Sequence, residues 1–532
     1  MKIKYSLGGV ILCAEDSNSD LLITKSENAN NVVVKIKALK DITLLTAVNQ
    51  IPYKIGLEDL LFINGYQSWT STHEVKLNFN EKNIGIFKAI KGIAEYGDYN
   101  FYKTRKDRLH SYEVFYVRSE NGIFILNNNF KNAFLNIEII KKGDQLNLLS
   151  DVDGKNLKAN EEFTIFDYDK YSSVDEGLEA FKNKYPKKDI KKIFGYTSWY
   201  NYYQKINEEI MLRDLSALDN RFDLFQIDDG YETFVGDWKD VDPVKFPNGL
   251  KPIVEKIHSK GLKAGLWLAP FVAEKKSKVF KEHPEYFKTG KNGKPIKVGV
   301  NWSGQYALDV EKEEVKQYIK DCLLHYVDMG FDFFKLDFIY SSAYIHDGIT
   351  RAEASDKSYK FLKEVLKGKI VLGCGATLSN VYDNFDYVRI GPDVSLSFDD
   401  IPPMRLLHRE RPSTKATLQN TIYRSFMNDR WFGNDPDVFL LRDTNIKLSK
   451  EQKRALVTIN ALFGNVLMTS DDIGSYDEEK KQLLESSLYL FKNAASRSFV
   501  TKDGIIHITY KLDDKVHEFD YDIKKGIMLN ER

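Results

Sequence analysis

Apolar and polar residues follow one pattern in the first third of the chain and another beyond it. Up to about residue 185, short runs such as 31–37 and 122–126 alternate apolar with polar residues, and Asn, Asp and Gly turns separate them. This alternation is typical of strands with one buried face. No long helical period begins before Val174. We therefore predict an all-β sandwich over residues 1–185.

From residue 186 onward, predicted strands alternate with predicted helices. Short apolar runs predict strands at 194–200, 222–227, 262–268, 331–337, 370–374, 387–390, 432–439 and 466–469. Helical periods lie at 208–218, 250–259, 311–329, 352–367, 414–427, 450–462 and 478–493. Eight such units over about 300 residues predict a (β/α)8 TIM barrel at 186–494. An open doubly wound sheet also alternates in this way, but no Gly-x-Gly-x-x-Gly turn follows the first strand.

The strand pattern returns at the end of the chain. Alternating runs at 505–510 and 516–521 predict a small C-terminal all-β domain over residues 495–532. The expected architecture is therefore a β-sandwich, a central barrel and a small β domain.

Composition narrows the classes of partner. The chain has 532 residues, and its 77 Lys and Arg balance 77 Asp and Glu, so we expect no nucleic-acid partner. No apolar run approaches roughly 18 residues, so no membrane span is expected. The three scattered cysteines and the short apolar run at 7–14 favour a cytoplasmic protein. Histidine spacing and loop motifs predict neither a metal nor a cofactor. The oligomeric state, including a homo-oligomer, stays open.

Polar and aromatic residues gather at the ends of the predicted barrel strands, where barrel active sites lie. Aspartates accept hydrogen bonds from sugar hydroxyls, and indole rings stack on the apolar faces of sugars. Each residue alone also suits a turn, a helix cap or a structural ion pair, but their joint placement favours a site for a polyhydroxylated ring. The strand ends carry Trp199, Asp228, Asp229, Trp267, Lys335, Asp337, Cys374, Arg389, Asp393, Asp435, Asp437, Asp471 and Asp472.

Two of these aspartates suit glycoside hydrolysis. Asp337 and Asp393 lie at or beyond the fourth and sixth strands, and they could face each other across the barrel mouth. Retaining glycosidases use two carboxyl groups about 5 to 5.5 Å apart, one as nucleophile and one as acid/base. Lys335 would keep Asp337 ionised. Arg389 beside Asp393 would work against an acid, so we expect Arg389 to bond the sugar or another acid instead.

Six stretches of the chain resemble one enzyme family, in the same order. They are 225–231 (Phe-Gln-Ile-Asp-Asp-Gly-Tyr), 265–271 (Gly-Leu-Trp-Leu-Ala-Pro-Phe), 335–337 (Lys-Leu-Asp), 389–394 (Arg-Ile-Gly-Pro-Asp-Val), 434–437 (Asn-Asp-Pro-Asp) and 468–472 (Met-Thr-Ser-Asp-Asp). The chain resembles the α-galactosidases of glycoside hydrolase family 36, in particular the shorter bacterial or archaeal members. The flanking β domains match that family's layout.

The resemblance implies a role for each site residue. Asp337 would be the nucleophile, and Asp393 the acid/base. Asp228 and Asp229 would bind the galactose 4- and 6-hydroxyls. The remaining implied substrate-binding residues are Lys335 and Arg389 on ring hydroxyls, Trp199 and Trp267 as pocket walls, Cys374 near O2, and Trp69 reaching in from the sandwich.

Two features leave alternatives open. By its polar surroundings alone, the stretch 64–71 that holds Trp69 is typical of a packed inter-strand loop. The run 373–377 around Cys374 departs from the family's Cys-Ser-Ser-Gly-Gly, which opens the choice between galactose and N-acetylgalactosamine. The expected activity is retaining hydrolysis of α-galactosides such as melibiose or raffinose. The alternatives are a raffinose-synthase-like transglycosylase, an α-N-acetylgalactosaminidase, and a non-catalytic sugar-binding barrel.

Overall fold

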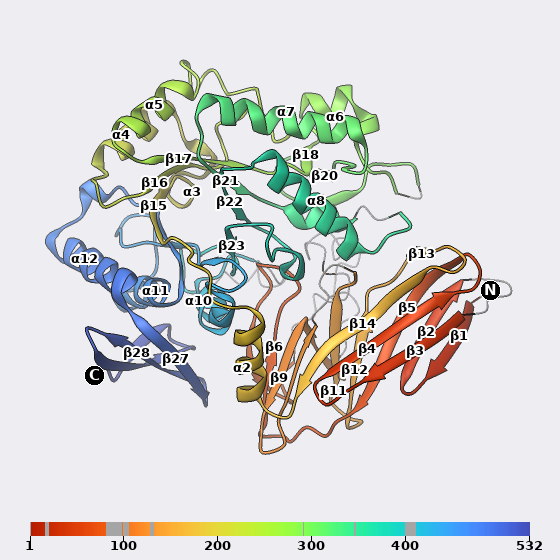
Figure 1. The fold of residues 1–532 in the computed structure, drawn as a ribbon. Helices are drawn as coiled ribbons and strands as arrows, with labels where there is room; N and C mark the ends of the chain where they lie inside the picture. The colour runs from red at the N-terminus through yellow and green to blue at the C-terminus, as the bar shows by residue number, and fades with distance from the viewer. Residues whose placement is uncertain are drawn as a thin grey trace.

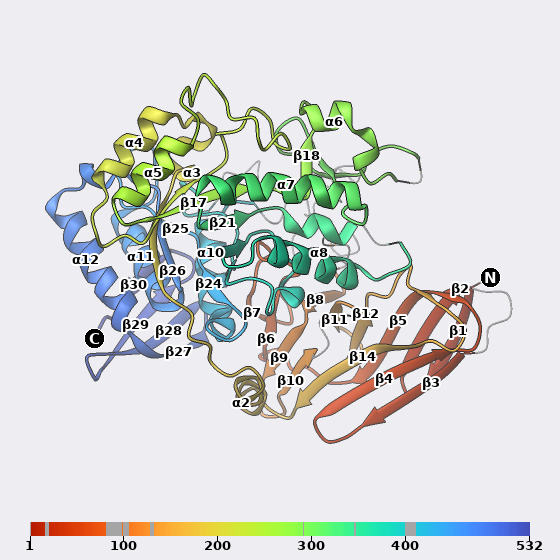
Figure 2. The same ribbon diagram turned by 45° about the horizontal axis from the view of Figure 1, so that its top comes forward.

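The structure is a computed structural model, and it describes residues 2–15, 21–80, 98, 106–127, 132–290, 292–344, 347–399 and 411–532. A strand-rich N-terminal part lies against a central barrel, and a small C-terminal sheet packs on another side of that barrel (Figures 1 and 2). The chain therefore has the three-part architecture that the sequence predicts. Among the described residues, no helix is both long and apolar enough to cross a membrane.

The N-terminal part is a sandwich of two seven-stranded sheets. The first sheet has the order β1 (Lys2–Leu7), β2 (Val10–Glu15), β5 (Ile42–Pro52), β12 (Gln145–Ser150), β11 (Leu135–Ile140) and β8 (Arg108–Tyr112), with β13 (Asn156–Leu157) paired to β5. The second has the order β3 (Leu21–Glu27), β4 (Asn31–Ala38), β14 (Glu162–Tyr171), β10 (Ile123–Asn127), β9 (Val114–Arg118), β6 (Leu60–Ile63) and β7 (His73–Lys76). Alternate residues of β4, among them Val32, Val34 and Ile36, are buried between the sheets, as the period-two pattern requires.

The barrel is a nine-stranded parallel sheet. Its order is β24 (Gly433–Asp435), β23 (Tyr387–Arg389), β22 (Ile370–Gly373), β21 (Phe333–Leu336), β17 (Lys263–Leu268), β16 (Leu224–Ile227), β15 (Ile193–Thr197), β26 (Val466–Thr469) and β25 (Val438–Phe439). Only Pro436 and Asp437 separate β24 from β25, so these two form one interrupted strand. Because β24 pairs with β23 and β25 pairs with β26, this strand closes the ring. The prediction of eight barrel strands is confirmed.

Among the described residues, seven helices lie in the predicted places around the barrel: α4 (Glu208–Ala217), α5 (Lys251–Ser259), α7 (Glu313–Met329), α8 (Arg351–Val365), α10 (Thr414–Tyr423), α11 (Lys450–Phe463) and α12 (Glu478–Asn493). Three further α-helices in the described part of the chain were not predicted: α2 (Val174–Lys184), α3 (Trp199–Tyr202) and α6 (Lys278–Glu282). The prediction of an all-β stretch up to residue 185 is therefore wrong at α2, which packs on β9, β10 and β14 of the sandwich. α4 begins with an N-cap, because the Asn207 side chain accepts a hydrogen bond of 2.8 Å from the Ile210 amide. A small sheet of β18 (Val272–Glu274), β20 (Gln305–Ala307) and β19 (Lys297–Gly299) follows β17.

The C-terminal part is a four-stranded antiparallel sheet that contacts α11. Its strands are β27 (Ala495–Lys502), β28 (Ile505–Leu512), β29 (Lys515–Asp522) and β30 (Ile527–Leu529). Ile506, Ile508 and Phe519 are buried and belong to the same apolar core as the barrel. This sheet is therefore packed onto the barrel rather than being a separate unit.

The sandwich and the barrel share one apolar core. Phe62 of β6 stacks on Tyr116 of β9 at a centroid distance of 4.6 Å, and its edge meets Phe426 at 6.0 Å. Phe181 of α2 also meets Phe426, at 5.2 Å. One face of the second sheet therefore packs on the barrel, while the opposite face closes the sandwich. This packing brings the loop between β6 and β7 to the barrel mouth.

Candidate active site

A cavity of about 420 Å³ lies at the C-terminal ends of the barrel strands. This is the end at which barrel enzymes carry their active sites. Eight of the predicted site residues line it, and they come from the sandwich and from five segments of the barrel. Its walls are Trp69, Trp199, Gln204, Asp228, Asp229, Trp267, Asn301, Trp302, Lys335, Asp337, Phe338, Asp393 and Pro412.

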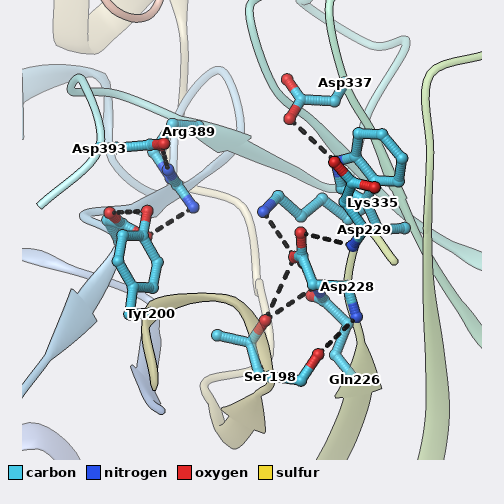
Figure 3. A network of polar contacts seen from close by, with 12 residues as sticks. Ser198, Tyr200, Gln226, Asp228, Asp229, Lys335, Asp337, Arg389 and Asp393 are labelled. Atoms are coloured by element: carbon cyan, nitrogen blue, oxygen red, sulfur yellow. Dashed lines mark hydrogen bonds and ion pairs between the residues drawn. The ribbon is translucent and has the colours of Figure 1, made fainter. Parts of the chain in front are cut away.

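Asp228 is fixed by a dense set of donors at the end of β16. Its Oδ2 accepts hydrogen bonds from Lys335 Nζ at 2.8 Å and from Gln226 Nε2 at 2.7 Å. Burial disfavours the charged form of Lys335, but the ion pair with Asp228 outweighs this and raises the pKa of Lys335. Figure 3 shows the Lys335 side chain pointing toward Asp228. The result is a rigid charged pair at the floor of the cavity.

Asp229 lies beside it, in a different environment. Gln204 Nε2 donates to both carboxylate oxygens at 3.0 and 3.1 Å, and Trp302 Nε1 donates to Oδ2 at 2.9 Å. Burial raises the pKa of Asp229. Burial also raises the pKa of the adjacent Glu232, and the negative charge of Asp229 adds to that shift. The two buried carboxyl groups therefore disfavour being charged together. The following Gly230 has φ +121°, and a side chain there would meet the Gln204 backbone at 2.7 Å.

Asp337 follows β21 and accepts two hydrogen bonds. Trp267 Nε1 donates to Oδ2 at 2.9 Å, and the Phe338 amide donates to Oδ1 at 2.8 Å. Burial raises the pKa of Asp337, whereas the positive charge of Lys335 and the Trp267 hydrogen bond lower it. The Cys374 thiol also hydrogen-bonds to this carboxylate. Cys374 is 1% exposed and lies behind Asp337, so the structure does not place it in the cavity wall as predicted.

Arg389 departs from the prediction. Its Nη1 donates to Asp393 Oδ1 at 3.1 Å, so the expectation that Arg389 would not pair closely with Asp393 is wrong. Its Nε donates to Asp435 Oδ2 at 2.9 Å, and its Nη2 lies 2.7 Å from Asp437 Oδ1. The guanidinium is buried and does not line the cavity. The physical reason is that Arg389 pairs with Asp435 and Asp437 of the interrupted strand, so its guanidinium does not reach the cavity.

Asp337 and Asp393 follow different strands, β21 and β23. In the view of Figure 3 the Asp393 side chain lies beside Arg389, and the Asp337 side chain lies apart from it, above Lys335. Both acids line the same cavity, and the Asp393 side chain is 37% exposed. Both carboxyl groups can therefore reach a ligand in this cavity.

Trp69 reaches the cavity from the sandwich. Its loop is bound to the barrel by the Ser68 amide, which donates to the Ala376 carbonyl at 2.9 Å, and by an isolated bridge between Gln67 and Thr377. Gly375 has φ +60°, and a Cβ there would lie 2.8 Å from the indole ring of Trp69. The loop is packed, as its polar surroundings predict, and Trp69 also lines the cavity.

Five wall residues were not predicted from the sequence: Gln204, Asn301, Trp302, Phe338 and Pro412. Trp302 lies in a polar Gly- and Ser-containing loop, which is the same signal that singled out Trp69. Phe338 has φ +53°, which is rare for an aromatic residue, and its ring meets Trp69 at 5.2 Å and Trp302 at 5.3 Å. Nothing in the sequence marks that backbone angle.

Comparisons with known proteins agree with this geometry. Residues 184–372 match the Melibiase family model. An α-galactosidase, Mel36A of Lactobacillus acidophilus, is 31% identical over 145 residues, which are 26% of this chain and 19% of that protein. The α-galactosidase TtGalA of Thermus thermophilus superposes with a TM-score of 0.71 at 23% identity, over 97% of this chain and 98% of its own. The GH36 α-galactosidase AgaA of Geobacillus stearothermophilus gives a TM-score of 0.63 at 12% identity, over 96% and 75%.

Residues 184–372 are thus similar in sequence to melibiases. The three-part fold is similar to that of the solved α-galactosidases over almost the whole length of this chain. The match in sequence to Mel36A is confined to 19% of that protein's length.

Proposed function

We propose that the protein is a retaining exo-α-galactosidase that removes terminal α-D-galactosyl residues from small galactosides such as melibiose or raffinose. One observation carries the proposal: Asp337 and Asp393 line one cavity whose floor is the Asp228–Lys335 pair. Known α-galactosidases match this chain in sequence or fold, which supports the same substrate class. The free cysteines Cys13, Cys322 and Cys374 support action in the cytoplasm.

The proposed reaction has two steps. In the first, the ionised Asp337 attacks C1 of the galactosyl ring while Asp393 gives its proton to the departing oxygen, leaving a galactosyl–aspartate ester. In the second, Asp393 takes a proton from water, the water oxygen bonds to C1, and the Asp337 carboxylate is released. Two inversions at C1 retain the α configuration. Each step needs both carboxyl groups, and both line the cavity.

Asp228 and Asp229 are proposed to select galactose. Both are buried at the cavity floor, and buried carboxylates that accept hydroxyl hydrogens discriminate strongly against a sugar that leaves them unpaired. Trp199, Trp267 and Trp69 supply flat apolar surface for the ring. Gln204 and Trp302 hold the Asp229 carboxylate in place by donating hydrogen bonds to it. The choice between galactose and N-acetylgalactosamine is proposed to depend on the run 373–377, which holds Cys374 behind Asp337.

The decisive experiment replaces the proposed nucleophile. Asp337→Gly should abolish turnover of p-nitrophenyl α-galactoside, and added azide should restore turnover and yield a galactosyl azide. Asp332→Asn is the matched control, because Asp332 precedes the same strand at the opposite end of the barrel and accepts from the Ala264 amide at 3.0 Å. It should stay within about twofold of wild type. Near-normal activity of Asp337→Gly would refute the proposal.

The alternatives are outcomes of the same study. A panel of α-galactoside, α-N-acetylgalactosaminide, α-glucoside and α-xyloside nitrophenyl substrates identifies the preferred ring. Products with and without a sugar acceptor separate hydrolysis from transglycosylation. Galactose binding by calorimetry with no turnover of any substrate would indicate a non-catalytic barrel.

A further inference from the structure

One buried cation serves three carboxylates beside the cavity. Arg389 contacts Asp435, Asp437 and Asp393 through its three nitrogens, at 2.9, 2.7 and 3.1 Å. Asp435 and Asp437 are 2% and 0% exposed, whereas the Asp393 side chain is open to the cavity. Asp435 and Asp437 are therefore shielded from a ligand in the cavity, and only Asp393 can meet one.

The interrupted barrel strand makes this arrangement. Pro436 and the left-handed φ of +72° at Asp437 break the strand between β24 and β25. The Asp437 amide donates to Asp435 Oδ1 at 2.9 Å, which orients the first carboxylate. Asp437 Oδ2 accepts from the Val394 amide at 2.7 Å, directly after Asp393. The same aspartate thus holds both the guanidinium and the backbone next to Asp393.

A third contact completes the cluster. The Tyr200 hydroxyl of α3 donates to Asp437 Oδ2. Figure 3 shows Tyr200 and Asp393 near the Arg389 side chain, with Asp337 farther away. The titratable and charged groups that act on this cluster from the surrounding elements are Tyr200, Tyr203, Lys335, Asp337, Cys374, Arg389, Asp393, Asp435 and Asp437.

We propose that Asp435 and Asp437 are positioning residues for the acid/base: they balance the charge of Arg389, so that Asp393 keeps the proton it must give to the leaving group. This inference rests on the proposed function. It answers the difficulty that Arg389 raises, because an arginine paired with Asp393 alone would favour the carboxylate over the acid. With Asp435 and Asp437 as buried partners, Arg389 orients Asp393 through one nitrogen while its other two nitrogens face the other two carboxylates.

The negative charge that Asp437 presents to Arg389 changes near neutral pH. Burial raises the pKa of Asp437 to about 7, against the opposing charge of Arg389. Replacing Asp437 by asparagine fixes the uncharged state and frees part of the positive charge of Arg389 for Asp393. If Asp393 loses its proton more readily, the protonated acid that the first step needs becomes scarce at a lower pH. The alkaline limb of kcat/KM should therefore move to lower pH.

The test measures kcat/KM against pH for Asp437→Asn and Asp435→Asn. The alkaline limb should shift down by about one pH unit, the lower end of the effect of a neighbouring cation. Melibiose, with a poor leaving group, should lose about tenfold more activity above the limb than p-nitrophenyl α-galactoside, which needs little acid assistance. A purely structural defect would lower both substrates equally.

Asp471→Asn is the matched control. Asp471 Oδ1 pairs with buried Arg442 Nη1 at 2.7 Å at the neighbouring strand end. This variant should lose stability to a similar degree but keep the wild-type limb and substrate ratio. Suppose that Asp337→Gly is inactive but that folded Asp435→Asn or Asp437→Asn keeps the wild-type alkaline limb of kcat/KM. That result overturns this inference and leaves the proposed function intact. If Asp337→Gly stays active, the proposed function itself fails.

Discussion

Asp337 is a residue on which burial and charge act in opposite directions. Burial raises its pKa, and Lys335 is the strongest influence that lowers it. As a nucleophile Asp337 must be ionised, so the acid limb of kcat/KM reports on its pKa in the free enzyme. Removing the lysine charge in Lys335→Met should raise that pKa and move the acid limb to higher pH by about one unit. The measurement is a pH profile of kcat/KM with p-nitrophenyl α-galactoside.

Lys263→Met is the control for this change. Lys263 begins the neighbouring strand β17 and is exposed, so its removal takes away the same charge far from the cavity. Its acid limb should coincide with that of wild type. If Lys335→Met merely lowers activity with no movement of the limb, Lys335 acts by holding Asp228 and not through the charge on Asp337.

Single residues differ in how far the sequence reveals them. Asp228, Asp337 and Trp267 follow from position alone, because the ends of parallel strands meet at one rim. Arg389 was assigned either to the sugar or to another acid, because a cation at a strand end has no visible partner in the sequence. Its partners Asp435 and Asp437 lie about 46 residues further along the chain, at a break in a strand. Trp302 was missed because its loop lies between two strands of a small sheet that no periodic pattern marks.

Elements were more predictable than contacts. The helices α7, α11 and α12 combine an apolar stripe with acidic residues in the first turn, and their residue ranges follow from that pattern. The interruption of the seventh strand did not follow, although Pro436 stands inside it. A proline inside a strand run indicates an edge or a break, but only the closed ring shows that both halves pair.

The link between α10 and the Trp69 loop depends on one side chain. Arg424, which ends α10, is fully buried, and its Nη1 donates to the carbonyls of Ser68 and Ile390, each at 2.7 Å. Its Nη2 donates to the carbonyl of Thr70 at 3.1 Å. Burial lowers the pKa of Arg424 to about 9. The cation is therefore held by backbone dipoles.

Arg424→Met should loosen this loop. It leaves several buried carbonyls without a donor, so the free energy of unfolding should fall by about 3 kcal/mol. Because Trp69 lines the cavity, KM for melibiose should rise more than kcat falls. Arg430→Met is the control: its guanidinium also donates to backbone carbonyls, those of Lys182 and Tyr185, but at the end of α2 away from the cavity. Equal changes in KM for both variants would contradict a role for Arg424 in placing Trp69.

The whole molecule joins a sandwich to a barrel through apolar contacts and through the site itself. Phe62, Tyr116 and Phe124 of the sandwich belong to the core cluster that fills the barrel, while the space between the two sheets has a cluster of its own. Five of the six tryptophans lie in the barrel, so fluorescence follows mainly that part, whereas far-ultraviolet dichroism follows all secondary structure. The two signals can therefore test whether the parts unfold together.

We expect one cooperative transition. Phe62→Ala should lower the free energy of unfolding by about 3 to 5 kcal/mol and move both signals together, because Phe62 lies at the junction. Val34→Ala truncates a side chain buried only within the sandwich. If sandwich and barrel are coupled, Val34→Ala moves the fluorescence transition as well, by about 1 to 2 kcal/mol. If Val34→Ala shifts the dichroism transition but leaves the fluorescence transition unchanged, the sandwich unfolds alone. The shared core would then be an interface between independent domains.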